Sequence, residues 1–398
     1  MSVFSSIELA PRDPILGLNE AFHNDTRPNK INLSAGVFLN EEGKVPLLNV
    51  VAEAEKARLA AHAAHSYLPM QGLPAYDAAV QRLLFGADSP VIAEGRALTV
   101  QSLGGTGALK LGADFIKRFF GDTRVVISNP SWANHRAIFE TAGLKVERYR
   151  YYDAATNSVD VKGMLEDLQA LPEGSVVLLH ACCHNPTGVD LSAENWSRVV
   201  DTIAGQRLVP FLDIAYQGFG DGLVEDALAL RLFSDSGLEF FVASSFSKSF
   251  SLYGERIGAL TVVANQQSVI EPVLSQFKRL IRTNYSNPPT HGAVVVSSVL
   301  NSTELYGQWQ QELTAMRAHI QQMRTALAQE LPRLGAARDF SFVTQQRGLF
   351  SYTGFSKEQI TRLRDEFAVY AINSGRINIA GLNRNNVEQV AQAIFKVL

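Results

Sequence analysis

The chain has 398 residues, of which 46% are apolar and 19% are charged, proportions typical of a globular protein rather than a disordered one. Its 36 basic and 39 acidic residues give a net charge of −3, which excludes a nucleic-acid binder held by bulk charge. The sequence has neither a membrane-length apolar run nor a secretory signal at its start, and its two cysteines, Cys182 and Cys183, are adjacent. We therefore expect a cytoplasmic protein of two or three domains.

Short apolar segments alternate with segments of helical spacing through the middle of the chain. The expected helices are Leu47–Ala63, Ala108–Phe120, Trp132–Thr141, Val161–Leu171 and Ala193–Ala204. The expected strands are Ala97–Leu103, Val125–Ser128, Ser175–Cys182, Leu208–Ala215 and Phe240–Ser245. Because these strands are apolar throughout, the pattern predicts an α/β fold with a doubly wound, mostly parallel sheet between helices.

The last third of the chain predicts a smaller α/β domain. We expect one long helix over Leu305–Leu331, strands at Phe340–Phe342 and Leu349–Tyr352, and helices at Lys357–Phe367 and Asn386–Val397. The strand-like Ile31–Leu33 needs a sheet partner, so the N-terminal residues are expected to join this domain. The predicted division is 1–45 (N-terminal arm and part of the small domain), 46–315 (large domain) and 316–398 (the rest of the small domain).

The first motif in chain order is SLGGTGAL, Ser102–Leu109, a strand followed by a glycine-rich turn and a helix. Backbone N–H groups at such a helix start bind phosphate, which makes Gly105 and Thr106 candidates. A dinucleotide fingerprint is the competing interpretation, but the glycine spacing does not match it.

The second motif is HACCHNPTG, His180–Gly188, at the carboxyl end of an expected strand, where ligands bind in open α/β sheets. Asn185 begins its turn sequence. A metal site built from His180, Cys183 and His184 is a weaker interpretation, because no second ligand cluster has zinc spacing.

The third motif is FLDIAYQGFG, in which Asp213 interrupts an otherwise apolar strand. A buried carboxylate needs a cationic partner, so Asp213 is either a counter-ion for a protonated heterocyclic nitrogen or a helix cap at a frayed strand end. Tyr216 is close enough in sequence to reach the same ligand.

The fourth motif, SSFSKSFSLYGER, is the most informative. A lysine on a serine-rich turn suits condensation with an aldehyde, and this role falls to Lys248. The hydroxyl groups of Ser245 and Ser247 and the guanidinium of Arg256 suit a phosphate. The alternative is a solvated loop with a stray lysine and arginine.

These four motifs, in this order, resemble the class I aminotransferases of the pyridoxal-phosphate fold type I family. The resemblance covers nearly the whole chain, from the Gly36 loop to SGRINIAGLN, and is closest to the aspartate and aromatic-amino-acid branch. Within that branch, QQRGLFSYTG (Gln345–Gly354) and YLPMQGL (Tyr67–Leu73) are similar to the bacterial tyrosine, or aromatic-amino-acid, aminotransferases.

The resemblance implies pyridoxal 5'-phosphate as cofactor and no metal. Lys248 then binds the cofactor and carries the proton, and Asp213 keeps the ring nitrogen protonated. The remaining implied contacts are Asn185 and Tyr216 on the phenolic oxygen, Trp132 on the ring face, Gly105, Thr106, Ser245, Ser247 and Arg256 on the phosphate, and His135 and His180 around Asp213.

The substrate residues implied by the resemblance are Gly36, Trp132, Asn185, Arg282 and Arg376. Arg376 would hold the α-carboxylate, while Arg282 would meet a side-chain carboxylate. In the family Arg282, and Tyr67 for the phosphate, come from the neighbouring subunit, which implies a homodimer with shared sites.

Substrate preference is predicted from two further positions. Dicarboxylate-specialised relatives often carry Lys where Leu39 stands and Thr where Val45 stands, so this wall is more apolar here. We therefore expect an aromatic-amino-acid transaminase (Phe, Tyr and also Trp) using 2-oxoglutarate, with side activity on aspartate. An aspartate aminotransferase with weak aromatic activity is the runner-up.

Three other classes of protein compete with this hypothesis. A β-lyase or decarboxylase would use the same cofactor residues, but Arg376 with Arg282 favours transamination with glutamate. A transcription regulator would need an added DNA-binding segment, for which the chain has no room. A nicotinamide-dependent dehydrogenase would depend on SLGGTGAL alone.

Overall fold

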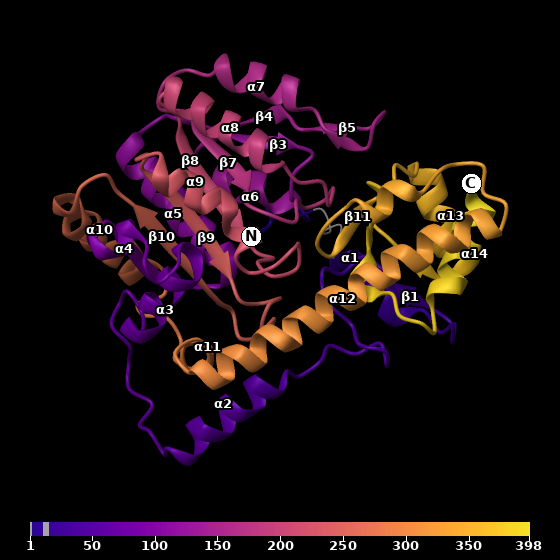
Figure 1. Cartoon of the computed structure of the whole chain (residues 1–398), viewed down its shortest axis with the longest axis horizontal. Coiled ribbons are helices and arrows are strands. Elements are labelled where there is room, and N and C mark those ends of the chain that lie inside the picture. Colours follow the sequence, from indigo (N-terminus) through magenta and orange to yellow (C-terminus); the bar gives the residue numbers. More distant parts are fainter. Residues whose placement is uncertain (1, 11–15) are drawn as a thin grey trace.

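A seven-stranded sheet forms the centre of the larger part of the computed structural model, which describes residues 2–10 and 16–398 (Figure 1). Across the sheet the strands are β2 (Ala97–Leu103), β10 (Ile257–Val263), β9 (Phe240–Ser245), β8 (Val209–Ile214), β7 (Val176–His180), β3 (Arg124–Asn129) and β4 (Lys145–Arg150). Only β10 runs antiparallel to its neighbours, so the prediction of a mostly parallel sheet is confirmed.

Helices cover both faces of this sheet because alternate residues of each strand enter different cores. On β7, Val176 and Leu178 belong to one buried cluster, and Val177 and Leu179 belong to the other. The first cluster is covered by α5 (Gly104–Phe120), α6 (Ala133–Thr141) and α10 (Ile270–Asn284). The second is covered by α3 (Pro74–Phe85), α7 (Val161–Gln169), α8 (Ala193–Gly205) and α9 (Leu228–Asp235). The doubly wound α/β fold is therefore confirmed.

A smaller group of elements lies beside the large sheet, and a long helix joins the two groups (Figure 1). The helix is α12 (Thr303–Arg333), which ends one residue after Pro332. The small group holds α1 (Leu16–Asn24), β1 (Ile31–Asn32), β11 (Phe350–Tyr352), α13 (Lys357–Phe367), β12 (Val369–Tyr370), β13 (Arg376–Asn378) and α14 (Val387–Val397). The expected partner for the N-terminal strand is β12, which pairs parallel with β1. The predicted domain limits, which include the undescribed residues 1 and 11–15, stay a prediction.

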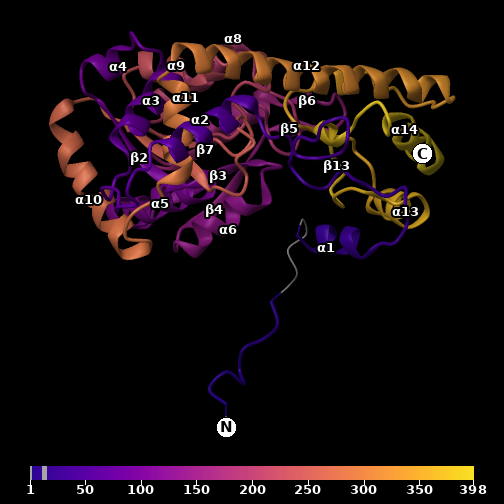
Figure 2. The same cartoon turned by 90° about the horizontal axis from the view of Figure 1, so that it is seen from below.

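Among the remaining elements, α2 (Asn49–Ala60), α4 (Pro90–Ala93) and the ribbon of β5 (Tyr152–Asp153) and β6 (Ser158–Val159) lie at the edges of the molecule (Figure 1). Helix α11 (His291–Leu300) is largely buried and packs against α2, α3 and α12. Residues 2–10 extend away from the body (Figure 2) and expose Val3, Phe4, Ile7 and Leu9. No helix among the described residues is both long enough and apolar enough to cross a membrane.

The strand expected at Phe340–Phe342 is wrong. This segment forms a 3₁₀ turn over Ser341–Thr344, because the Asp339 carboxylate accepts hydrogen bonds from the backbone N–H and hydroxyl of Ser341 at 2.7 Å each. Such local bonds compete with strand pairing. The two phenylalanines instead pack against the Arg338 guanidinium.

Candidate active site

A pocket opens at the carboxyl edge of the sheet, where β7, β8 and β9 end and the small group of elements approaches. Its volume is about 190 Å³. It is lined by Gly36, Gly105, Thr106, Leu109, Trp132, His180, Asn185, Asp213, Ala215, Tyr216, Ser245, Ser247, Lys248, Arg256, Phe350 and Arg376. All four motifs singled out in the sequence therefore contribute to one cavity.

One end of the pocket is a cradle of backbone and hydroxyl groups. Helix α5 begins at Gly104, where φ is +68° and a side chain would come within 2.6 Å of Arg256. A side chain at Gly105 would press on Ser245 at 3.2 Å, so glycine lets this helix start approach both residues. The Ser247 backbone N–H donates to the Ser245 hydroxyl at 3.3 Å. Gly105 and Thr106 at this helix start face the pocket together with the Arg256 guanidinium, an arrangement that suits a phosphate.

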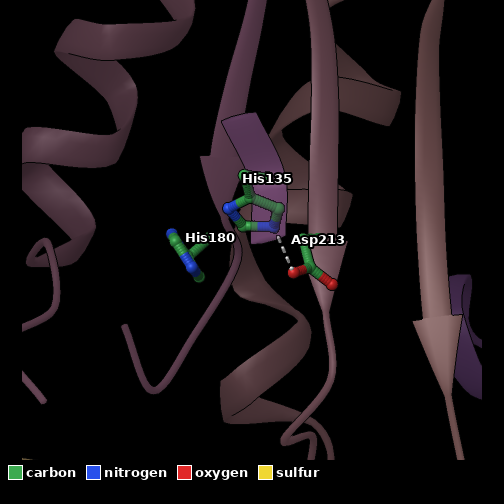
Figure 3. A group of neighbouring side chains, drawn as sticks. All are labelled: His135, His180 and Asp213. Carbon is green, nitrogen blue, oxygen red and sulfur yellow. Dashed lines mark hydrogen bonds and ion pairs between the residues drawn. The ribbon is translucent and has the colours of Figure 1, made fainter. Parts of the chain in front are cut away.

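The middle of the pocket holds a buried carboxylate, Asp213 on β8. Figure 3 shows the His135 ring beside it, with Nε2 3.0 Å from the carboxylate, while the Ser131 hydroxyl lies 2.9 Å from Nδ1 of the same ring. Burial alone raises the pKa of Asp213, but the His135 hydrogen bond and the charges of His135 and Lys248 lower it overall. Asp213 is therefore ionised and able to hold a cation from a ligand.

His135, His180 and Asp213 also have ligand atoms within 4.8 Å of one another, a spacing that a metal ion would accept. The direct bond from His135 already occupies one carboxylate oxygen. The absence of a metal stays a prediction.

Lys248 follows β9 and lies inside the pocket rather than on a solvated loop. Its amine lies 5.3 Å from the centre of the Tyr216 ring. Burial lowers the pKa of this amine to about 8, although the nearby Asp213 carboxylate opposes the shift. A larger fraction of the amine is therefore neutral near physiological pH than in an ordinary lysine, which favours nucleophilic attack on an aldehyde.

The opposite wall carries Arg376, which is only 4% exposed. Its Nη1 donates to the Asn185 side chain at 3.1 Å, and its Nη2 donates to the Ser34 carbonyl at 2.7 Å. The guanidinium carbon lies 4.1 Å from the centre of the Phe350 ring. Nε has no hydrogen-bond partner among the described residues, which leaves donor capacity for a carboxylate.

These residues fit pyridoxal phosphate. Both ring nitrogens of His180 are buried without a partner in the described part of the chain, and buried polar atoms of this kind need a polar ligand. The cradle at Gly105 suits a phosphate, Asp213 suits a protonated ring nitrogen, and Lys248 suits an aldehyde. These three kinds of group line one cavity, and together they suit the functional groups of that cofactor.

Five of the residues assigned by the family resemblance are absent from the pocket lining of this chain. Tyr67 is 92% exposed, and Arg282 is also exposed and donates to the Ser286 hydroxyl of its own chain at 2.5 Å. Leu39 and Val45 are likewise absent from the lining. His135 lies behind the pocket, against Asp213.

Three lining residues were not predicted: Leu109, Ala215 and Phe350. Leu109 lies in SLGGTGAL, Ala215 in FLDIAYQGFG and Phe350 in QQRGLFSYTG. No pattern separates an apolar wall residue from an apolar core residue, so the sequence offers no direct signal for them.

Comparisons with known proteins give the class of this one. Residues 28–394 match the family model of aminotransferase class I and II. The chain is 62% identical, over the full length of both, to a protein of Pseudomonas aeruginosa named aspartate aminotransferase. It is 50% identical, also over both full lengths, to the tyrosine aminotransferase of Klebsiella pneumoniae. The crystal structure of an aromatic-amino-acid aminotransferase from Burkholderia pseudomallei, covalently bound to pyridoxal phosphate, superimposes with a TM-score of 0.98 at 57% identity, covering all of both chains.

The chain belongs to the class I and II aminotransferases. Within that class it is a pyridoxal-phosphate-dependent transaminase of the aspartate and aromatic-amino-acid branch. The family, the fold type I architecture and the cofactor predicted from the sequence are thereby confirmed.

Proposed function

We propose that this transaminase moves the amino group of an aromatic L-amino acid, phenylalanine, tyrosine or tryptophan, to 2-oxoglutarate by a ping-pong mechanism, with side activity on aspartate. The observation that carries this preference is the apolar part of the pocket lining, formed by Leu109, Trp132 and Phe350, of which Phe350 packs on the Arg376 guanidinium. Removing an aromatic ring from water against such a wall contributes about 1.5–3 kcal/mol when burial is complete.

The proposed roles follow from the charges of the pocket. Pyridoxal phosphate, when bound, supplies the aldehyde and the electron-accepting ring. Lys248 would hold that aldehyde, and its amine, when free, would move a proton at the substrate Cα. Asp213 holds a proton on the ring nitrogen, and Asn185 and Tyr216 orient the ring oxygen. The phosphate contacts fall to Gly105, Thr106, Ser245, Ser247 and Arg256, with Trp132 on the ring face.

Arg376 is proposed to bind the α-carboxylate of every substrate, with Gly36 and Asn185 shaping the same end of the pocket. Its guanidinium is already held by Asn185 and Ser34, so little side-chain freedom is lost on binding. The preformed geometry favours a bidentate contact.

The test is kcat/KM for phenylalanine, tyrosine and aspartate with 2-oxoglutarate as acceptor. We expect both aromatic substrates to exceed aspartate, and we expect Leu39→Lys with Val45→Thr to shift the ratio toward aspartate. A value for aspartate far above both aromatics in the unaltered enzyme would refute the preference while leaving the transaminase assignment intact.

A second candidate is an aspartate aminotransferase with weak aromatic activity. The 62% identity to the Pseudomonas aeruginosa protein of that name favours it. The same substrate panel separates the two candidates, because only the relative kcat/KM values differ between them.

The active unit is proposed to be a cytoplasmic homodimer with shared sites. Tyr67 and Arg282 are exposed and remain outside the pocket of their own chain, although the family uses both positions. The apolar side chains exposed on residues 2–10 are further surface that a second copy would cover. A cytoplasmic location is supported by the two free, buried cysteines.

A further inference from the structure

A second polar cavity, of about 110 Å³, lies between α12 and two loops. One loop follows Tyr216 and the other precedes β11. The cavity is lined by Phe219, Gly220, Asp221, Arg317, Ile320, Gln321, Arg324, Thr344, Gln345, Gln346, Arg347 and Gly348. The aminotransferase chemistry described above uses none of these residues.

The charge of this lining is unbalanced. It contains three guanidinium groups and one carboxylate, Asp221, which accepts from Arg347 Nε at 2.7 Å. Arg317 and Arg324 have no carboxylate within ion-pair distance in the described part of the chain. A concentration of unpaired positive charge in a confined cavity attracts an anion.

Arg324 is the buried source of this charge, since only 2% of the residue is exposed. Its Nη1 donates to the Val343 carbonyl and the Ser351 hydroxyl, and its Nη2 donates to the carbonyls of Gly348 and Phe350. These neutral oxygens satisfy its hydrogen bonds but do not cancel its charge. A buried cation without an ionic partner is costly, and an anion in the cavity would offset that cost.

Donors for an anion are available from three sides. Gln346 is 4% exposed, and neither its amide nitrogen nor its amide oxygen has a hydrogen-bond partner within residues 2–10 and 16–398. Arg317 donates from Nη1 to the Gly218 carbonyl at 2.7 Å and keeps further N–H groups. Arg347 uses Nε for Asp221 and keeps Nη2. Buried amides left unpaired in a polar cavity point to a missing partner.

The neighbouring acidic groups do not fill this role. Asp190 accepts from the backbone N–H groups of Cys183 and His184, and Asp226 accepts from those of Gly218 and Gly220. Both carboxylates line an adjacent cavity, which shares Asp221 and Arg347 with this one. Asp190 acts on Arg324 and Arg347 through space, without an ion-pair contact in the described part of the chain.

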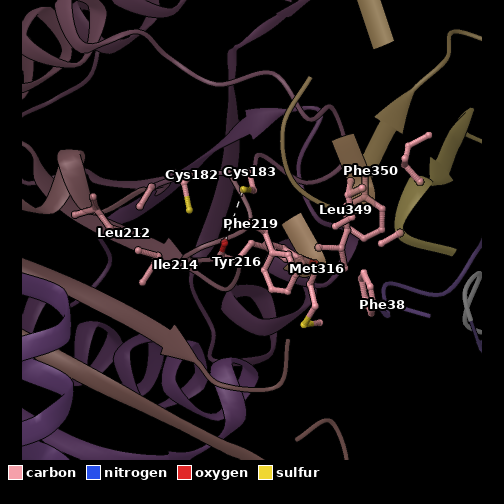
Figure 4. Close-up of a cluster of buried hydrophobic side chains, with 14 of the residues drawn as sticks. Phe38, Cys182, Cys183, Leu212, Ile214, Tyr216, Phe219, Met316, Leu349 and Phe350 are labelled. Atoms are coloured by element: carbon pink, nitrogen blue, oxygen red, sulfur yellow. Dashed lines mark hydrogen bonds between the residues drawn. The ribbon is translucent and has the colours of Figure 1, made fainter. Parts of the chain in front are cut away.

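We propose that the cavity enclosed by Arg317, Arg324, Arg347 and Gln346 is a binding site for a small oxyanion, either a tetrahedral anion such as phosphate or the carboxylate of a small acid. Figure 4 shows that Phe219, Met316, Leu349 and Phe350 form part of the apolar cluster near Tyr216. The oxyanion site shares no lining residue with the active site. The two sites are connected through Phe350, whose carbonyl accepts from Arg324 and whose ring packs on Arg376. The proposal does not depend on which amino acid the enzyme prefers.

The test measures binding of radiolabelled inorganic phosphate to the holoenzyme by equilibrium dialysis at constant ionic strength. Loading with pyridoxal phosphate fills the phosphate cradle of the active site beforehand. We expect one additional phosphate per chain, and loss of one charge-assisted contact in Arg317→Gln should raise Kd about tenfold. Gln346→Leu, which keeps every charge, should also weaken binding. Arg207→Gln is the matched control, because Arg207 lies on the surface and pairs with Glu173.

The proposal would be overturned if the unaltered holoenzyme bound no additional phosphate. It would also be overturned if Arg317→Gln and Gln346→Leu bound phosphate as tightly as the unaltered holoenzyme does. Competition by acetate would identify the site as one for carboxylates in general, and resistance to acetate would identify it as one for tetrahedral oxyanions. Both of these results require the site to exist, and neither depends on transaminase activity.

Discussion

At the scale of single residues, Asp213 has the clearest electrostatic task. It is buried, ionised and bonded to His135, so it stabilises positive charge on a bound ring. Asp213→Asn removes that charge and keeps the size of the side chain. We expect kcat to fall at least about a hundredfold, the order seen when one preorganised electrostatic group is removed from an active site. The measurement is the single-turnover half-reaction with phenylalanine, and a rate within a few-fold of the unaltered enzyme would contradict the role.

The Lys248 amine gives a pH prediction at the same scale. Its pKa is lowered to about 8 by burial, so the neutral, reactive fraction rises as pH approaches that value and then levels off. Uptake of pyridoxal phosphate by the apoenzyme should accelerate about tenfold per pH unit below the pKa and flatten above it. Absorbance during loading reports this rate.

Asp213→Asn supplies the control for that profile. The Asp213 carboxylate raises the pKa of Lys248 against the effect of burial, so its removal should move the midpoint to lower pH. A profile that keeps rising to the ordinary pKa of a lysine would show that the amine is not in the environment described here.

The polar residues of the site could be predicted from sequence, whereas its apolar wall could not. Asp213 was identifiable because a charge inside an apolar strand is costly without a partner, and Lys248 because a lysine on a serine-rich turn suits condensation with an aldehyde. Phe350 carries no such cost, and only the fold brings it within 4.1 Å of the Arg376 guanidinium. The role of Gly104 was not predicted either, because its close approach to Arg256 joins two residues that are distant in sequence.

At the scale of elements, the packing of α5 on the sheet gives a stability prediction. A side chain at Gly112 would come within 2.5 Å of the Phe211 ring on β8, so Gly112→Ala should lower the free energy of unfolding by about 1–3 kcal/mol. Gly307 in α12 has open space around its Cβ position, so Gly307→Ala should raise it by about 0.5–1 kcal/mol through helix propensity. Denaturant unfolding of the two holoenzyme variants tests the pair, and changes of the same sign would contradict the packing described.

Element prediction succeeded where one local signal dominated. Strands β2 and β9 have the predicted bounds, because long apolar runs between turns leave little choice. Strand β10 is equally buried, but no strand was predicted for it, because it directly follows the motif that ends at Arg256. At Phe340–Phe342 the apolar pattern was outweighed by the bonds between Asp339 and Ser341, which a count of hydrophobic residues does not register.

At the scale of the whole molecule, exposed Tyr67 and Arg282 make shared active sites testable. If Arg282 serves the neighbouring subunit, co-expression of Lys248→Ala with Arg282→Ala chains gives mixed dimers that each contain one intact site. Activity on aspartate should then return to about a quarter of the unaltered level, because about half the dimers are mixed and half their sites are intact.

Co-expression of Lys248→Ala with Asp213→Asn is the matched control. Both residues line the pocket of their own chain, so every mixed site is defective and no activity should return. Recovery in neither pair would mean that Arg282 acts within its own chain, whereas full activity of Arg282→Ala chains expressed alone would mean that Arg282 has no role with aspartate.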